Sequence, residues 1–80
     1  MARSEAEIRD WCLAYLARML ERPDIDADAP FPRIGLDSAM VLYFVTDLEA
    51  WIGVELWPEV AFEHPSVTQL SRYLVGQQPG

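Results

Sequence analysis

The sequence predicts an all-α protein, a bundle of four helices, from three observations. Two serines are each followed three residues later by a glutamate or glutamine, Ser4 by Glu7 and Ser66 by Gln69, which is the capping-box pattern of a helix N-terminus. Apolar residues recur at spacings of three and four, the period of a helix with one buried face. One stretch, residues 54–57, alternates like a strand, but no second strand is present to pair with it, so we interpret it as a connection.

The first helix is predicted over about residues 4–20. It begins at the Ser4 capping box, and Pro23 prevents it from continuing far beyond residue 20. One apolar stripe runs along it: Ile8, Trp11, Cys12, Tyr15, Leu16 and Met19. We therefore interpret Cys12 as a small core residue.

A long loop is predicted between the first two helices. Residues 22–37 hold three prolines and show no helical period. Four apolar residues are expected to anchor the loop on the core: Ile25, Phe31, Ile34 and Leu36. Long loops in small domains are uncommon and often functional, and this one leads directly into Ser38.

The second helix is predicted over residues 38–52, with Gly53 as its stop. One face accounts for the core: Val41, Phe44, Val45, Leu48 and Ile52. Leu42 and Tyr43 fall away from that face. Two alternatives stay open for them, a partner surface or cover by a neighbouring loop.

A short third helix is predicted over residues 58–63, because Pro58 suits a first helical turn and Pro65 ends the segment. The fourth helix is predicted over residues 66–75, from the second capping box to Gly76. Its stripe consists of Val67, Leu70, Tyr73 and Leu74. We expect the tail, residues 76–80, to be loose.

Length and composition predict one domain, residues 1–80, in a folded and monomeric protein. The chain has 80 residues, of which 51% are hydrophobic and 24% charged. The single Cys12 cannot form an internal disulfide, and no charged-then-apolar segment marks a signal peptide. The longest apolar run, residues 39–45, is too short to span a bilayer. We therefore expect a cytoplasmic protein that is not inserted in a membrane.

The charge distribution disfavours nucleic acid and anionic membranes as partners. The net charge is −7, and the six acidic residues between positions 37 and 63 have no basic residue among them. Such a field repels phosphates and attracts a partner with a basic surface. The alternative is that the acidity only keeps a small domain soluble.

The residues do not favour catalysis or a metal site. One histidine and one cysteine cannot supply the four ligands of a structural zinc site. Asp37 adjoins Ser38, so it is poorly placed to orient His64 in a catalytic triad. No glycine-rich phosphate loop is present. We interpret His64 as a capping or packing residue and predict a protein that is not an enzyme.

The tetrapeptide Gly35-Leu36-Asp37-Ser38, at the start of a hydrophobic second helix, resembles the phosphopantetheine attachment site of acyl carrier and peptidyl carrier proteins. Its context extends the resemblance over about residues 5–75. The third and fourth helices resemble those of carrier domains from polyketide and nonribosomal peptide assembly lines, on these residues: Leu56, Pro58, Phe62-Glu63-His64-Pro65-Ser66, Leu70 and Tyr73-Leu74.

The resemblance implies a four-helix bundle of the acyl-carrier type with 4′-phosphopantetheine covalently attached to Ser38. A separate phosphopantetheinyl transferase would supply the arm from coenzyme A, and the arm would hold an acyl or aminoacyl group as a thioester. Gly35, Leu36 and Asp37 would be its neighbours, with Gly35 permitting a close approach of loop and helix. We expect Ser38 itself to be the N-cap, since a helix N-terminus favours a phosphate.

The resemblance also implies a docking face on the second helix, made of Asp37, Ala39, Met40, Leu42, Tyr43 and Asp47. Ala39 stands where the family usually has leucine, and Tyr43 where fatty-acid carriers usually have an acid. These departures favour a discrete carrier of a secondary-metabolite pathway. Its partners would be a loading enzyme, either an adenylate-forming ligase or an acyltransferase, and downstream synthase or transferase enzymes.

Two further hypotheses complete the set of expectations. Any cavity between the helices would be filled by large aromatics such as Trp11, Trp51 and Trp57. The alternative to a carrier is a small acidic helical adaptor for protein interactions that has no cofactor.

Overall fold

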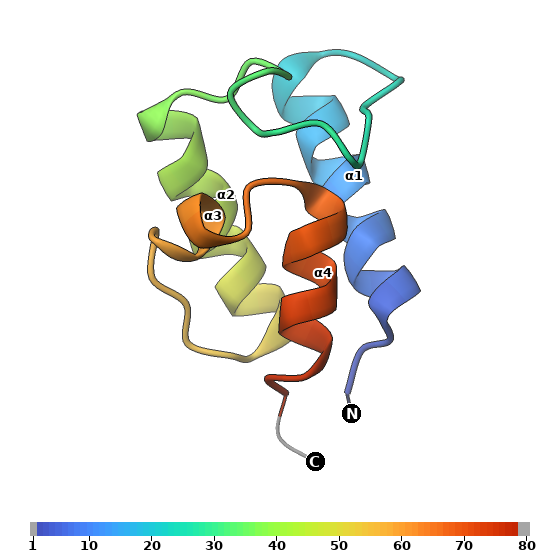
Figure 1. Ribbon diagram of the computed structural model, residues 1–80, viewed down its shortest axis with the longest axis vertical. Helices are drawn as coiled ribbons and strands as arrows, with labels where there is room; N and C mark the ends of the chain where they lie inside the picture. The colour runs from blue at the N-terminus through green and yellow to red at the C-terminus, as the bar shows by residue number, and fades with distance from the viewer. Residues whose placement is uncertain (1, 79–80) are drawn as a thin grey trace.

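The computed structural model describes residues 2–78 and contains four helices. They are α1 (Glu5–Leu20), α2 (Ser38–Ile52), α3 (Val60–Glu63) and α4 (Val67–Val75). No strand occurs within the described residues, so the all-α prediction is confirmed. In Figure 1, α4 lies beside α1, α2 stands on the other side of the bundle, and the short α3 lies between α2 and α4.

The start of α1 has the predicted capping box. The Ser4 hydroxyl accepts a hydrogen bond from the Glu7 N–H at 3.1 Å, and the Glu7 carboxylate accepts one from the Ser4 N–H at 2.9 Å. The helix ends because Glu21 adopts a left-handed conformation, with φ +54°, and its N–H returns to the last turn. Pro23 follows after this turn has already closed the helix.

The core is formed by most residues of the predicted stripes together with the loop between α1 and α2. Tyr73 was wrongly predicted on the α4 stripe, since it is exposed, and Trp11, Tyr15 and Met19 of the α1 stripe are half-buried. Phe44, at 0% exposure, is the largest fully buried side chain. Cys12 belongs to the same core cluster and is fully buried, which confirms the core role predicted for it. The other buried apolar residues are Ile8, Leu16, Phe31, Ile34, Leu36, Val41, Val45, Leu48, Ile52, Val60, Ala61, Val67, Leu70 and Leu74.

The long loop is ordered by its apolar anchors and by hydrogen bonds to the start of α4. Phe31, Ile34 and Leu36 are buried and Ile25 is half-buried, as predicted. The Phe31 N–H donates to the Pro65 carbonyl at 2.8 Å, and the Thr68 N–H donates to the Ala27 carbonyl at 3.0 Å. These contacts fix the end of the loop, and hence the position of the first turn of α2.

Two predicted features of the third and fourth helices were wrong. α3 begins at Val60 rather than at Pro58, because Val60 and Ala61 donate to Trp57 and Pro58 in i→i+3 bonds of 3.0 and 3.1 Å that make a turn. At α4 the capping box is half formed. Ser66 accepts from the Gln69 N–H, but the Gln69 side chain accepts from the Ser66 hydroxyl instead of its backbone.

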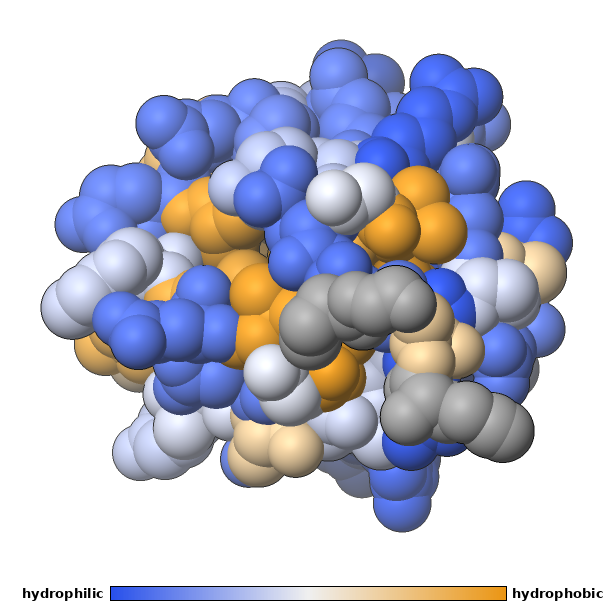
Figure 2. All heavy atoms as spheres, turned by 90° about the horizontal axis from the view of Figure 1, so that it is seen from below, coloured by the Kyte–Doolittle hydropathy of each residue, from blue (hydrophilic) through white to orange (hydrophobic). Residues whose placement is uncertain are grey.

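The prediction of a loose tail was also wrong as far as residue 78. The Gln78 side chain accepts from the Arg3 N–H and donates to the Arg3 carbonyl, each at 2.6 Å, so the two ends of the described chain are joined. Residues 79 and 80 lie outside the described residues. Figure 2 shows this end of the molecule, where hydrophobic side chains gather at the middle and hydrophilic ones surround them. No helix in residues 2–78 is both long and apolar enough to cross a membrane.

Candidate functional site

The N-cap of α2 is Asp37 and not Ser38. The Asp37 carboxylate accepts a hydrogen bond from the Met40 N–H at 2.9 Å, and Asp37 has the extended backbone of a cap residue. Ser38 is therefore the first residue of the helix, and the expectation that it would be the cap was wrong. The physical reason is position: the side chain of the residue just before the first turn reaches the free N–H of the third helical residue, here Met40.

The Ser38 side chain is exposed and uncommitted. None of the side-chain hydrogen bonds found among residues 2–78 uses its hydroxyl. It stands at the positive end of the α2 dipole, where the first backbone N–H groups have no acceptor within the helix. An anion attached at this hydroxyl would lie among these donors.

The loop that leads to Ser38 needs a glycine for its backbone conformation rather than for space. Gly35 has φ +103°, a region that other L-residues rarely adopt. A Cβ at this position would meet only a Leu20 methyl group at 3.9 Å, which is ordinary contact. The predicted role of Gly35 in close packing was therefore wrong. Leu36, which follows, is buried and donates its N–H to the Phe31 carbonyl at 3.1 Å.

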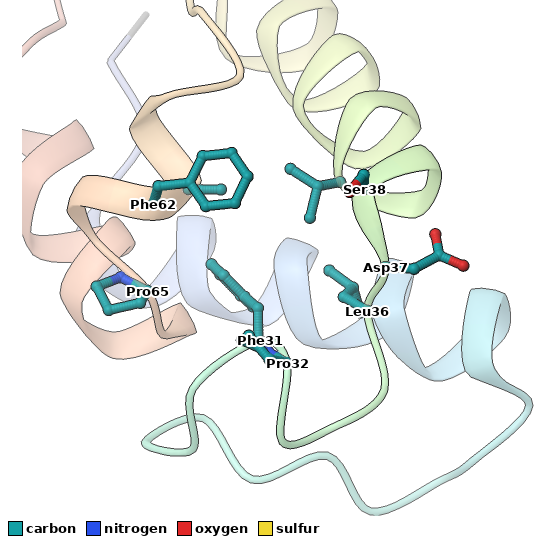
Figure 3. A pocket seen from close by; sticks show the side chains of 9 residues that line it. Phe31, Pro32, Leu36, Asp37, Ser38, Phe62 and Pro65 are labelled. Atoms are coloured by element: carbon teal, nitrogen blue, oxygen red, sulfur yellow. The ribbon is translucent and has the colours of Figure 1, made fainter.

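An apolar cavity of about 300 Å³ opens beside Ser38. Figure 3 shows Asp37 and Ser38 at its edge and Phe62 reaching across it from α3. Its lining comes from the loop, the start of α2, α3 and the α3–α4 connection: Phe31, Pro32, Leu36, Asp37, Ser38, Val41, Ala61, Phe62 and Pro65. Sequence reasoning missed Phe31 and Phe62 as lining residues, because no local pattern relates positions so far apart in the chain.

The tryptophans do not fill this cavity, so that hypothesis was wrong. Trp11 and Trp51 stack on each other between α1 and α2, with ring centroids 5.1 Å apart. The Arg3 guanidinium lies over the Trp51 ring at 4.5 Å, and Tyr15 stacks on Trp11 at 5.1 Å. Trp57 is 68% exposed and belongs to a different hollow.

The predicted docking residues fall into two groups. Ala39, Leu42 and Tyr43 are exposed and, with Thr46 and Asp47, line a shallow hollow of about 340 Å³ on the outer face of α2. Tyr43 is 67% exposed, so the alternative in which a loop covers this surface is excluded.

The polar and flexible members of the predicted face have structural contacts. The Asp47 carboxylate accepts from the Tyr15 hydroxyl at 2.6 Å, and the Asp37 carboxylate caps α2. Met40 is half-buried against the core. The remaining free surface of α2 is therefore mainly apolar and aromatic.

His64 has the packing role predicted for it. Its ring stacks on Tyr73 with centroids 4.1 Å apart. Its backbone N–H donates to the Val60 carbonyl at 3.0 Å and ends α3. Residues 2–78 contain no group of three or more His, Cys, Asp or Glu side chains arranged to hold a metal ion.

Comparison with known sequences identifies related proteins. The family model described as "Phosphopantetheine attachment site" matches residues 10–74. The acyl carrier protein TtuC of Teredinibacter turnerae is 33% identical over 73 residues, which are 89% of this chain and 84% of TtuC. The spectinabilin polyketide synthase system protein NorC of Streptomyces orinoci is 36% identical over 83 residues, which cover 94% of this chain but 4% of NorC.

Comparison with solved structures gives the same result. A free-standing peptidyl carrier protein from an uncharacterized secondary metabolic pathway of Acinetobacter baumannii superposes with a TM-score of 0.85 and 31% identity, covering 91% of this chain and 94% of that one. The A1-type acyl carrier domain from module 5 of MLSA1 gives a TM-score of 0.84 at 26% identity, covering 95% and 79%.

Proposed function

We propose, because this chain belongs to the family of carrier proteins with a phosphopantetheine attachment site, that Ser38 is the serine to which the arm is attached. Members of this family carry phosphopantetheine covalently on a serine and carry substrates rather than catalysing reactions. When bound, the group supplies a terminal thiol that holds an acyl group as a thioester. Membership of this family sets aside the alternative of an adaptor without a cofactor.

Ser38 is the best candidate among the four serines of the sequence. Ser4 lies outside the residues matched by the family model, and its hydroxyl takes part in the α1 capping box. Ser66 and Ser71 are buried, at 4% and 1% exposure. Ser38 alone combines an exposed side chain with a place inside the matched residues.

The surroundings of Ser38 fit the chemistry of the arm. The observation that carries the proposal is a free hydroxyl at the first position of α2, on the rim of an apolar cavity. Unpaired N–H groups and the helix dipole at this position favour a phosphodiester. Asp37 would hold the turn in place through its cap, and Leu36 and Gly35 would set the end of the loop.

We further propose that residues 1–80 are one domain that acts as a discrete carrier in a secondary-metabolite pathway of the polyketide or nonribosomal peptide type. The similarity over most of the length of TtuC and of the free-standing peptidyl carrier supports a separate protein. The similarity to a small part of a polyketide synthase system protein supports the pathway type. Its cargo would be an acyl or aminoacyl group. The protein would be located in the cytoplasm.

The partners of such a carrier would be a phosphopantetheinyl transferase, a loading enzyme and downstream synthase or transferase enzymes. Carrier domains of polyketide synthase systems work with synthase enzymes. We propose that the outer face of α2 docks them through Ala39, Leu42 and Tyr43, with Asp37, Met40 and Asp47 shaping the face from its edges.

The attachment site is tested by intact mass after incubation with coenzyme A, magnesium and a promiscuous phosphopantetheinyl transferase. Wild type should gain the mass of one phosphopantetheine group, and Ser38→Ala should gain none. Ser4→Ala is the matched control, because it removes another serine hydroxyl at a helix N-terminus and should be modified like wild type. Modification of Ser38→Ala, or failure of wild type with several transferases, would contradict the assignment.

The docking face is tested by Tyr43→Glu in the holo protein. We expect slower loading by the cognate enzyme with no loss of thermal stability, because the side chain is 67% exposed. Ala50→Glu is the control, since it adds the same charge to an exposed position of α2 outside the hollow. Equal slowing by both variants would show that charge alone, and not the Tyr43 surface, controls loading.

A further inference from the structure

A second hollow lies on α3, on the side away from Ser38. It measures about 190 Å³ and is lined by Glu55, Leu56, Trp57, Glu59, Val60, Glu63 and Tyr73. The cavity beside Ser38 uses Ala61 and Phe62 of the same helix, and the two hollows share no lining residue. Phe62 points into the first cavity, as Figure 3 shows. A molecule bound in the second hollow would therefore leave Ser38 accessible.

The aromatic residues of this hollow are held in place but left exposed. Trp57 is 68% exposed, whereas the two other tryptophans of the sequence are half-buried and stack on each other. The connection that bears Trp57 is fixed by the Leu56 N–H, which donates to the Glu49 carboxylate at 2.8 Å. Tyr73 is held from the opposite side by its stack on His64. An exposed, preformed aromatic surface of this kind is typical of a binding surface.

The charges around the hollow favour a partner with positive charge. Glu55, Glu59 and Glu63 line it, and neither of the two ion pairs found in residues 2–78 includes them. No lysine or arginine occurs in the sequence between Arg33 and Arg72, and the one histidine there, His64, stacks on Tyr73, so no permanent positive charge on this stretch of chain balances the glutamates. An arginine suits both the exposed indole ring and the glutamates, because its guanidinium stacks on an indole ring and forms paired hydrogen bonds with carboxylates.

We propose that this hollow is a second partner site, one that binds an arginine-bearing segment of a partner protein whether or not the arm is present. An apolar residue beside the arginine would pack on Leu56 and Val60, and the guanidinium would lie on Trp57 between the glutamates. The site would tether the carrier to its assembly while the Ser38 face exchanges enzymes. The proposal goes beyond the attachment of the arm and does not depend on it.

The test is an NMR titration of isotopically labelled apo and holo protein with the acetylated peptide amide Leu-Arg-Leu-Arg-Leu at low salt. We expect the Trp57 indole resonance and the Glu59 and Glu63 amides to move together, with the same affinity in both forms. The peptide with lysine in place of arginine should bind about fivefold more weakly, because an ammonium group neither stacks nor pairs in the same way. Added salt should weaken the binding.

Two variants of exposed aromatic side chains test where on the protein the peptide binds. Trp57→Ala should lower the affinity for the arginine peptide by about tenfold, which is the order expected for loss of a cation–π contact and its packing. Phe62→Ala is the matched control, with the similar exposure of 67% on the other side of α3, and should bind like wild type. Equal binding by Trp57→Ala and wild type, shifts centred on the outer face of α2, or equal affinity for the lysine peptide would each overturn the proposal.

Discussion

At the scale of single residues, the neighbours Asp37 and Ser38 have different roles. One caps α2, and the other presents a free hydroxyl. Asp37 caps α2 through the Met40 N–H, so the structural task falls on the carboxylate. The Ser38 hydroxyl is thereby left without a hydrogen-bond partner within residues 2–78. The hydroxyl that we propose as the attachment point is therefore not needed to cap the helix.

This division predicts different stabilities for two neighbouring alanine variants. Asp37→Ala should lower the free energy of unfolding by about 1 kcal/mol, the usual effect of losing an N-cap. Ser38→Ala should change it by less than about 0.5 kcal/mol, as for an exposed surface position. Urea unfolding of both variants followed by circular dichroism measures the two values. Equal losses would mean that Ser38 contributes to the cap.

Ser71 gives a second prediction, this time of a stabilising substitution. It is 1% exposed on α4, and its hydroxyl has no hydrogen-bond partner among the described residues. A buried hydroxyl without a partner is unfavourable, so Ser71→Ala should raise the free energy of unfolding by about 1 kcal/mol. Ser66→Ala is the contrasting variant, because Ser66 is also buried but caps α4, and its loss should destabilise by about 1 kcal/mol. Destabilisation by Ser71→Ala would show that its hydroxyl is satisfied in solution.

At the scale of elements, α1 and α2 are joined by an aromatic stack that ends in a hydrogen bond. Tyr15 stacks on Trp11 and donates its hydroxyl to the Asp47 carboxylate at 2.6 Å. Burial, followed by the hydrogen bond to Asp47 and its charge, raises the pKa of Tyr15 from 10 to about 12. The neutral hydroxyl is therefore the form that the folded state favours.

The raised pKa of Tyr15 predicts a loss of stability in base. Below pH 10 the contribution is fully present, because Tyr15 is protonated in both the folded and the unfolded state. As the pH rises from 10 to 12 the unfolded state loses its proton first, and the contribution disappears. Wild type should be more stable than Tyr15→Phe by about 1 kcal/mol at pH 7, and this difference should decrease steadily as the pH rises from 10 to 12. Urea unfolding at a series of pH values measures this.

Tyr43→Phe is the control for that series, since it removes the hydroxyl of an exposed tyrosine on the neighbouring face. It should follow wild type at every pH. A constant difference between Tyr15→Phe and wild type from pH 7 to 12 would mean that the hydroxyl does not titrate as the bond to Asp47 requires.

The sequence predicted the elements that depend on local signals. The Ser4 capping box, Gly53 with its φ of +77° and the apolar period of α2 are each readable within a few residues. The start of α3 was missed because a proline suits the turn before a helix as well as its first turn.

Most of the missed features of the site join distant segments. The Tyr15–Asp47 bond and the cavity between Phe31 and Phe62 come from packing, which no local pattern encodes. Likewise, the sequence showed that Asp37 and Ser38 lie at a helix start, but only the backbone conformation decides which of the two is the cap. The attachment motif and the exposed side chains of α2 were therefore predictable from the sequence, and the cavity beside Ser38 was not.

At the scale of the whole molecule, the acidic and apolar surfaces divide between two sides of α3. The cavity beside Ser38 and the hollow on the outer face of α2 are lined mainly by apolar and aromatic side chains, with Asp37 and Asp47 as their only acidic members. Three glutamates that have no ion pair among the described residues, Glu55, Glu59 and Glu63, line the hollow beside Trp57. The acidic side chains behind the net charge of −7 are therefore spread unevenly between these two surfaces.

The whole fold also protects the one thiol of the sequence. Cys12 is 0% exposed in the core, and burial raises its pKa to about 12. A thiol reacts as its thiolate and only when a reagent can reach it. In the native apo protein, Cys12 should therefore not react with an aromatic disulfide reagent on the timescale of minutes, and it should react completely in denaturant. Its labelling rate becomes a measure of opening of the core.

The same experiment separates the core thiol from that of the arm. After incubation with the transferase and coenzyme A, wild type should show one rapidly reacting thiol and one protected thiol, whereas Ser38→Ala should show only the protected one. The rapid thiol would belong to the arm, because the solvent-exposed rim at Ser38 lies outside the core that covers Cys12. Rapid labelling of the apo protein would contradict this, since it would require the core around α1 to open far more readily than its packing allows.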